Sequence, residues 1–129
     1  SDDPYVKILG GGFMFNYREA EVFYGFTAHV VRPLASGSII EATFDNPAGG
    51  APLVVSERVS TMTDRYALRT PPVRGVEAKK PYHVSIRVYD REKTTMLWQT
   101  ETDFTSQVSD KVVPDKPLTV GPGYHLNPD

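Results

Sequence analysis

The sequence predicts an all-β fold in which two antiparallel sheets pack face to face. Apolar and polar residues alternate over several short segments, and proline and glycine separate these segments at a spacing of about ten residues. No segment of ten or more residues has the apolar periodicity of an amphipathic helix. Alternation with a period of two is typical of strands that bury one face. About seven to eight such strands in 129 residues favour a β-sandwich.

The clearest alternation runs over residues 82–88 and predicts a strand in the middle of the sandwich. A polar segment over 90–95 turns the chain into a second strand over 96–104, so the two segments form a predicted β-hairpin. The first of these strands is expected to bury Tyr82, Val84, Ile86 and Val88 and to expose His83, Ser85, Arg87 and Tyr89.

Shorter apolar segments before the hairpin predict the remaining strands, at 5–9, 13–17, 22–31, 38–44, 53–62 and 66–69. Gly10-Gly11-Gly12 lacks the Gly-Lys-Ser/Thr that completes a phosphate-binding loop, so we expect a β-bulge or a switch between sheets there. We predict one sandwich domain over 1–113. A proline-rich, extended tail over 114–129 follows, with one strand at 118–120.

Composition excludes several classes of function. The net charge is −2 and no more than two basic residues are adjacent, so the chain offers no basic surface to nucleic acid. No apolar segment approaches the ~18 residues of a membrane span. With no cysteine, disulfides and thiolate metal sites are impossible. The polar start, Ser1-Asp2-Asp3-Pro4, is compatible with a removed signal peptide and a periplasmic or extracellular location.

No local motif predicts catalysis, a metal or a cofactor. His29, His83 and His125 form no paired ligand motif, and no serine lies in a G-x-S-x-G sequence. A calcium site at Asp64, Asp90 and Glu92 lacks the usual ligand spacing. Two carboxylates across a groove would suit glycoside hydrolysis, but charge pairing across strands explains the candidates better; they are Glu41, Asp45, Glu101 and Asp103.

One local spacing resembles fibronectin type III and related immunoglobulin-like sandwiches. Val76 precedes Tyr82 by six residues, and an alternating strand begins at that tyrosine. In those folds the tyrosine hydroxyl bonds back to the backbone of the preceding corner. The resemblance covers 66–104, with 66–69 similar to strand E, 82–88 to strand F and Trp98 on strand G. It implies an immunoglobulin-like, fibronectin III-like antiparallel sandwich and carries no activity with it.

The predicted binding site lies on the outer face of the strands similar to C, F and G. Alternation places Arg87, Tyr89, Glu41 and Gln99 outside the core, and exposed tyrosine and arginine are common anchors of protein interfaces. The sequence therefore predicts a non-enzymatic module that binds another protein or part of an envelope assembly of an exported bacterial protein. A carbohydrate-binding module and an accessory domain of a larger enzyme are the alternatives. The face could also be an ordinary solvated one, or be covered by the tail through Leu118, Val120, Tyr124 and Leu126.

Overall fold

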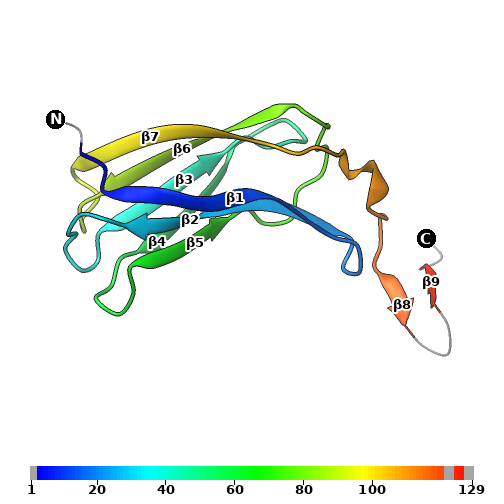
Figure 1. The fold of residues 1–129 in the computed structure, drawn as a ribbon, viewed down its shortest axis with the longest axis horizontal. Helices are drawn as coiled ribbons and strands as arrows, with labels where there is room; N and C mark the ends of the chain where they lie inside the picture. The colour runs from blue at the N-terminus through cyan, green and yellow to red at the C-terminus, as the bar shows by residue number, and fades with distance from the viewer. Residues whose placement is uncertain (1–2, 121–123, 127–129) are drawn as a thin grey trace.

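The chain forms two antiparallel sheets packed face to face, which confirms the all-β sandwich (Figure 1). The computed structural model describes residues 3–120 and 124–126. The first sheet has the order β1-β2-β5, and the second has the order β4-β3-β6-β7. The strands are β1 (Val6–Asn16), β2 (Glu21–Val30), β3 (Ile39–Phe44), β4 (Leu53–Arg58), β5 (Arg65–Arg69), β6 (Pro81–Tyr89) and β7 (Met96–Thr105).

The chain after β7 leaves the sandwich at one end (Figure 1). A short 3₁₀ helix, η1 (Asp110–Val112), is followed by β8 (Leu118–Val120) and β9 (Tyr124–Leu126), which pair with each other. The sequence predicts the first of these two strands and misses the second. The four residues predicted to cover the sheet lie in β8 and β9, outside the residues whose side chains are described. No helix in the described ranges has the length and apolar character to cross a membrane.

Residues 6–16 form one strand where the sequence predicts two. The glycines do not end it: the pairing of β1 with β2 continues on both sides, with a shift of register between Leu9 and Gly12. The predicted β-bulge is therefore confirmed. Gly11 has a φ of 124°, and a Cβ there would lie 2.5 Å from the Phe104 ring. Only glycine fits this position without displacing the ring.

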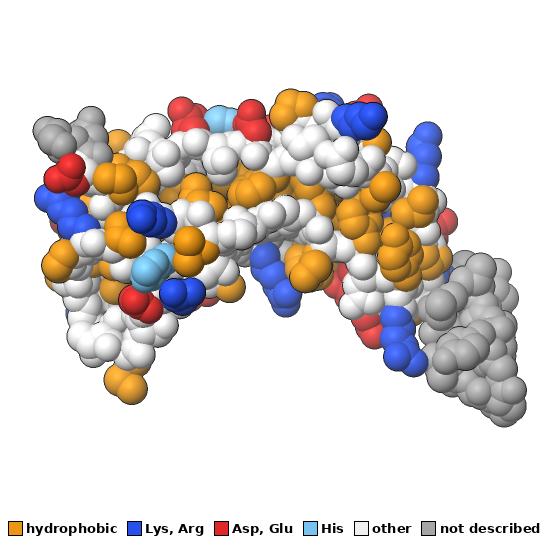
Figure 2. All heavy atoms as spheres, in the orientation of Figure 1, with side chains coloured by type: hydrophobic (Ala, Val, Ile, Leu, Met, Phe, Trp, Pro, Cys, Tyr) orange, Lys and Arg blue, Asp and Glu red, His pale blue; other side chains and the backbone are white. Residues whose placement is uncertain are grey.

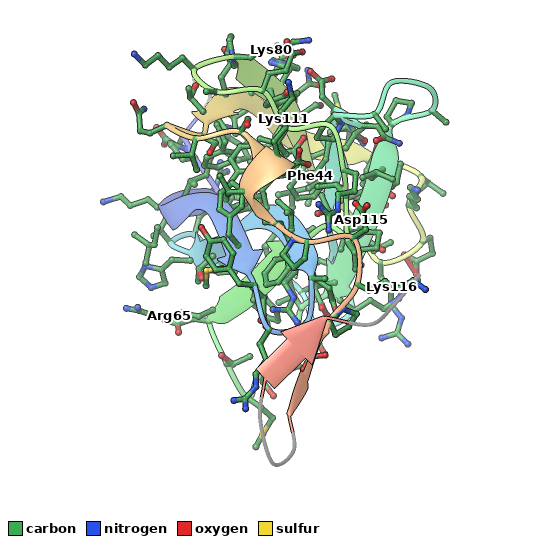
Figure 3. The ribbon with its side chains drawn as sticks, turned by 90° about the vertical axis from the view of Figure 1, so that its right-hand side faces the viewer. Phe44, Arg65, Lys80, Lys111, Asp115 and Lys116 are labelled. Carbon is green, nitrogen blue, oxygen red and sulfur yellow. The ribbon has the colours of Figure 1, made fainter. Side chains whose placement is uncertain are left out.

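Alternate residues of the central strands fill the space between the sheets, as the sequence predicts. Phe44 lies in the interior in Figure 3 and is completely buried. Burying a side chain of this size contributes about 1.5–3 kcal/mol. The other fully enclosed core residues are Val22, Tyr24, Ala28, Ile40, Ala42, Leu68, Val84, Ile86 and Val88.

Tyr24 is the centre of an aromatic cluster. Its ring stacks on Phe13 at 4.4 Å between centroids and meets the edge of Phe44 at 5.2 Å. Its hydroxyl donates to the carbonyl of Asp45, so the buried polar atom is satisfied. Burial raises the pKa of Tyr24 above its ordinary value, which keeps the hydroxyl protonated as a donor.

Tyr82 forms the predicted corner. Its side chain is buried, and its hydroxyl accepts a 2.8 Å hydrogen bond from the backbone N–H of Glu77 and donates to the carbonyl of Gly75 at 3.4 Å. This arrangement confirms the prediction that the hydroxyl bonds the preceding backbone. The corner thereby fixes how the chain crosses from the first sheet to β6.

Arg74 and Asp110 hold the segment after β7 against this corner. The Arg74 guanidinium donates to the carbonyls of Ala20, Asp110, Val113 and Pro114. The Asp110 carboxylate accepts from the N–H groups of Gly75 and Val76 at 2.7 and 3.1 Å. These bonds replace water at backbone groups that are buried in this segment. The segment can therefore pack against the domain, with Val113 buried at one end of the core.

The Tyr82→Phe variant tests the corner. Removing the hydroxyl leaves the Glu77 N–H without its acceptor, so we expect the free energy of unfolding to fall by about 0.5–1.5 kcal/mol. Urea unfolding measures the change. Tyr17→Phe is the matched control, because Tyr17 is 49% exposed on a turn and should change stability by less than about 0.5 kcal/mol. An unchanged midpoint for Tyr82→Phe would remove the argument for the corner.

Candidate functional site

The register of the second sheet brings the four predicted site residues together. Glu41 on β3 is paired with Arg87 on β6, and Arg87 is paired with Gln99 on β7. Tyr89 follows two residues after Arg87 and therefore projects from the same face. These residues form a row across three adjacent strands, which we call the Arg87 row.

Arg87 has a hydrogen-bond partner at each guanidinium nitrogen. Nε donates to the Tyr89 hydroxyl at 3.1 Å, and Nη1 donates to the Ser85 hydroxyl at 2.6 Å. Nη2 donates to the Glu41 carboxylate at 3.1 Å and to the Thr43 hydroxyl at 2.5 Å. The side chain is thus held in one orientation by neighbours on its own face of the sheet. Alternation also points Thr43 and Ser85 to this face, so the sequence contained the signal for both.

Glu41 corrects one expectation. The sequence predicts a solvated carboxylate, but Glu41 is 9% exposed because the loop after β6 folds over it. Lys93 in that loop donates to the second carboxylate oxygen at 2.8 Å. Burial by itself raises the pKa of Glu41, but the hydrogen bonds and charges of Lys93 and Arg87 outweigh it, so this pKa lies below its ordinary value.

Asp90 fixes the conformation of the loop that carries Lys93. Its carboxylate accepts from the backbone N–H groups of Thr94 and Thr95 and from the Thr94 hydroxyl, at 2.7–3.0 Å. Lys93 has a φ of 58°, and its ammonium lies 5.3 Å from the centroid of the Tyr89 ring. The loop conformation has no periodic signal in the sequence, and Lys93 is not among the four predicted site residues.

Apolar side chains flank the Arg87 row on both sides. Val54 on the edge strand β4 is 59% exposed beside Thr43. At the other edge, a register shift in the pairing of β6 with β7 leaves Met96 and Leu97 50% and 38% exposed. The face therefore combines a fixed polar centre with an apolar border.

A second polar group lies further along β6. His83 is held between two carboxylates of β7, with Nδ1 2.9 Å from Asp103 and Nε2 2.7 Å from Glu101. The Asp45 carboxylate accepts the backbone N–H of His83 at 2.8 Å. These contacts confirm charge pairing across strands. Hydrogen bonds that the carboxylates of Asp103 and Glu101 accept from the ring raise the pKa of His83 above its ordinary value.

The remaining metal candidates do not converge. Asp64 pairs with His29 at 3.0 Å, and Asp90 is engaged in its own loop. Over residues 3–120 and 124–126, no three His, Asp or Glu side chains gather as ligands for one ion. His125 lies outside the residues whose side chains are described.

Comparison with known proteins gives no match, either to a protein-family model or to a curated sequence.

Glu41→Gln tests whether the row depends on charge. The amide keeps the shape of the side chain but leaves the Arg87 and Lys93 charges without a buried counter-charge. We expect the free energy of unfolding to fall by about 1–3 kcal/mol. Urea unfolding measures this change. Glu57→Gln is the control, because Glu57 is an exposed glutamate on β4. Equal effects of the two substitutions would show that Glu41 contributes no more than a surface charge.

His83→Gln tests the pH dependence. The folded-state pKa of His83 lies above its unfolded value of about 6.5. The contribution of protonated His83 to the free energy of unfolding is therefore fully present below that pH. It is lost as the pH rises through the folded-state pKa. The variant should therefore lower Tm at pH 5.5 more than at pH 8.5, and 1 M NaCl should reduce the difference because the group is exposed. The same loss of Tm at both pH values would contradict this.

Proposed function

We propose that the chain is a non-enzymatic, immunoglobulin-like and fibronectin III-like module that binds another protein through the outer face of β4-β3-β6-β7. The strands similar to E, F and G occupy β5, β6 and β7, and β6 lies between β3 and β7 as the resemblance implies. The Tyr82 corner supports the same assignment. Membership of an envelope assembly and location in the periplasm or outside the cell stay predictions.

The observation that carries the proposal is the preformed Arg87 row. Interfaces gain affinity when anchor side chains are ordered before binding, since little rotamer entropy is lost. Arg87 donates hydrogen bonds to the Tyr89 hydroxyl and to the Glu41 carboxylate, so both anchor side chains are already held in place. Val54 and Leu97 at the border supply apolar area that a partner can cover.

A carbohydrate ligand fits this face less well. Sugar-binding surfaces use several exposed rings, whereas Tyr17 is the sole aromatic residue in the exposed class among those whose side chains are described. Tyr89 is half-buried beneath Lys93, so it does not present a bare ring face. A polar centre with an apolar border suits a folded protein partner.

Substitutions at the border test the proposal without breaking the row. Val54→Asp places a charge on the face at an exposed position. Val31→Asp is the matched control, because Val31 is exposed directly after β2, a strand of the other sheet. We expect a partner captured by the wild-type chain from its source extract to bind the Val54→Asp variant at least about tenfold more weakly and the control unchanged. Equal capture by Val54→Asp, with an unchanged melting curve, would exclude this face.

A further inference from the structure

The outer face of the β1-β2-β5 sheet carries a hollow that the proposed function does not use. It is open to solvent and has a volume of about 370 Å³, at the lower end of the range of small-molecule sites. Figure 2 shows the face that β1 crosses, where hydrophobic side chains gather along the middle and are interrupted by the white surface of backbone and other side chains. The lining residues follow the bulge of β1, the middle of β2 and the end of β5.

The backbone of glycine residues, which have no side chains, forms the floor of this hollow. Gly12 on β1 is paired with Gly25 on β2, so two neighbouring strands present bare backbone side by side. A Cβ at Gly10 or Gly12 would have no atom within 4 Å and would project into open space. A Cβ at Gly25 would lie 2.2 Å from the carbonyl oxygen of Leu68, so the backbone of β5 packs too closely against Gly25 to admit a side chain there.

The bulge is fixed from beneath by the core. The backbone at Gly11 packs against Phe104, and the Phe104 ring is stacked on Phe26 at 6.3 Å between centroids. Because the glycine conformation is tied to these buried rings, the bulge that forms one side of the hollow is part of the folded structure.

The walls combine aromatic, thioether and cationic groups. Phe23 on β2 and the 59% exposed Met14 on β1 face the same hollow. The Arg69 guanidinium stacks over the Phe23 ring at 4.5 Å. No acidic residue lines the hollow, and Arg69 forms no salt bridge with any described residue. Arg87 on the opposite sheet, by contrast, has a carboxylate partner.

We propose that this hollow binds a small aromatic carboxylate. A planar ring can lie on the flat glycine floor against Phe23 and Met14, where ring and sulfur contacts are favourable. The carboxylate then reaches Arg69, whose planar guanidinium can donate two parallel hydrogen bonds while it stays stacked on Phe23. The single unpaired cation selects an anion, and the volume limits the ligand to a small molecule.

Titration with 2-naphthoate, followed by amide chemical shifts in the full chain, tests the proposal. We expect saturable shifts confined to the glycine segment of β1, the middle of β2 and the end of β5. Arg69→Gln should weaken binding by about tenfold or more, the usual contribution of a charge-assisted hydrogen bond. Ala67→Leu should abolish binding without changing Tm, because Ala67 is an exposed strand residue that lines the hollow.

Arg65→Gln is the control for charge on the same strand and face. Arg65 points away from the molecule in Figure 3 and does not line the hollow, so this variant should bind 2-naphthoate as the wild type does. Any of four outcomes would overturn the proposal: no saturation by millimolar 2-naphthoate, shifts on another surface, equal weakening by Arg65→Gln and Arg69→Gln, or equal binding of (2-naphthylmethyl)ammonium. Tighter binding of decanoate would overturn the choice of an aromatic ligand.

Discussion

The ring of Tyr24 lies between the two sheets, and its aromatic contacts reach four other strands: Phe13 on β1, Phe44 on β3, Tyr82 on β6 and Phe104 on β7. Edge-to-face and stacked contacts of this kind add about 0.5–1.5 kcal/mol each beyond the area they bury. The hydroxyl of Tyr24 bonds the chain just after β3, and its backbone N–H donates to Thr70 after β5. One residue therefore ties the sheets together and orders the segments that leave them. A loss of volume here would loosen both sheets at once, because protein interiors leave few compensating voids.

The polar contacts at the end of the sandwich follow from this packing. The corner before β6 has to pass over the aromatic cluster, and its backbone groups lose water where it does so. Tyr82 satisfies two of them, and the Asp110 carboxylate satisfies two more. Arg74 satisfies backbone acceptors instead, by donating hydrogen bonds to carbonyl groups. The segment after β7 is thus bound to the domain mainly through backbone groups, which explains how a polar sequence with little periodicity can remain part of the fold.

Sequence patterns predicted the strands of the two sheets and the direction of their side chains, because alternation depends only on neighbours along the chain, although they divided β1 in two and missed β9. The Val76–Tyr82 spacing predicted the corner for the same local reason. Contacts made by loops were not predictable: Asp90 sets a conformation that carries Lys93 onto Glu41, and nothing in the spacing of these residues indicates it. The glycine segment was predicted as a bulge, but its role as the floor of a hollow depends on Gly25 in the next strand. Such cross-strand coincidences appear only once the register is known.

The two outer faces of the sandwich use arginine in opposite ways. On β4-β3-β6-β7, Arg87 is neutralised by Glu41 and held by hydroxyl groups, so its charge mainly organises the sheet face. On β1-β2-β5, the Arg69 guanidinium lies beside an apolar hollow and over the Phe23 ring, and it forms no salt bridge with a described residue. A ligand that covers an arginine already paired with a carboxylate adds little new interaction. An arginine without a carboxylate partner can form a new charge-assisted hydrogen bond with an anionic ligand. If both proposals hold, the first face is recognised by its shape and by the apolar area at its border, and the second by its charge. Because the two faces lie on opposite sheets, the proposed protein partner and the proposed aromatic carboxylate do not compete for one surface.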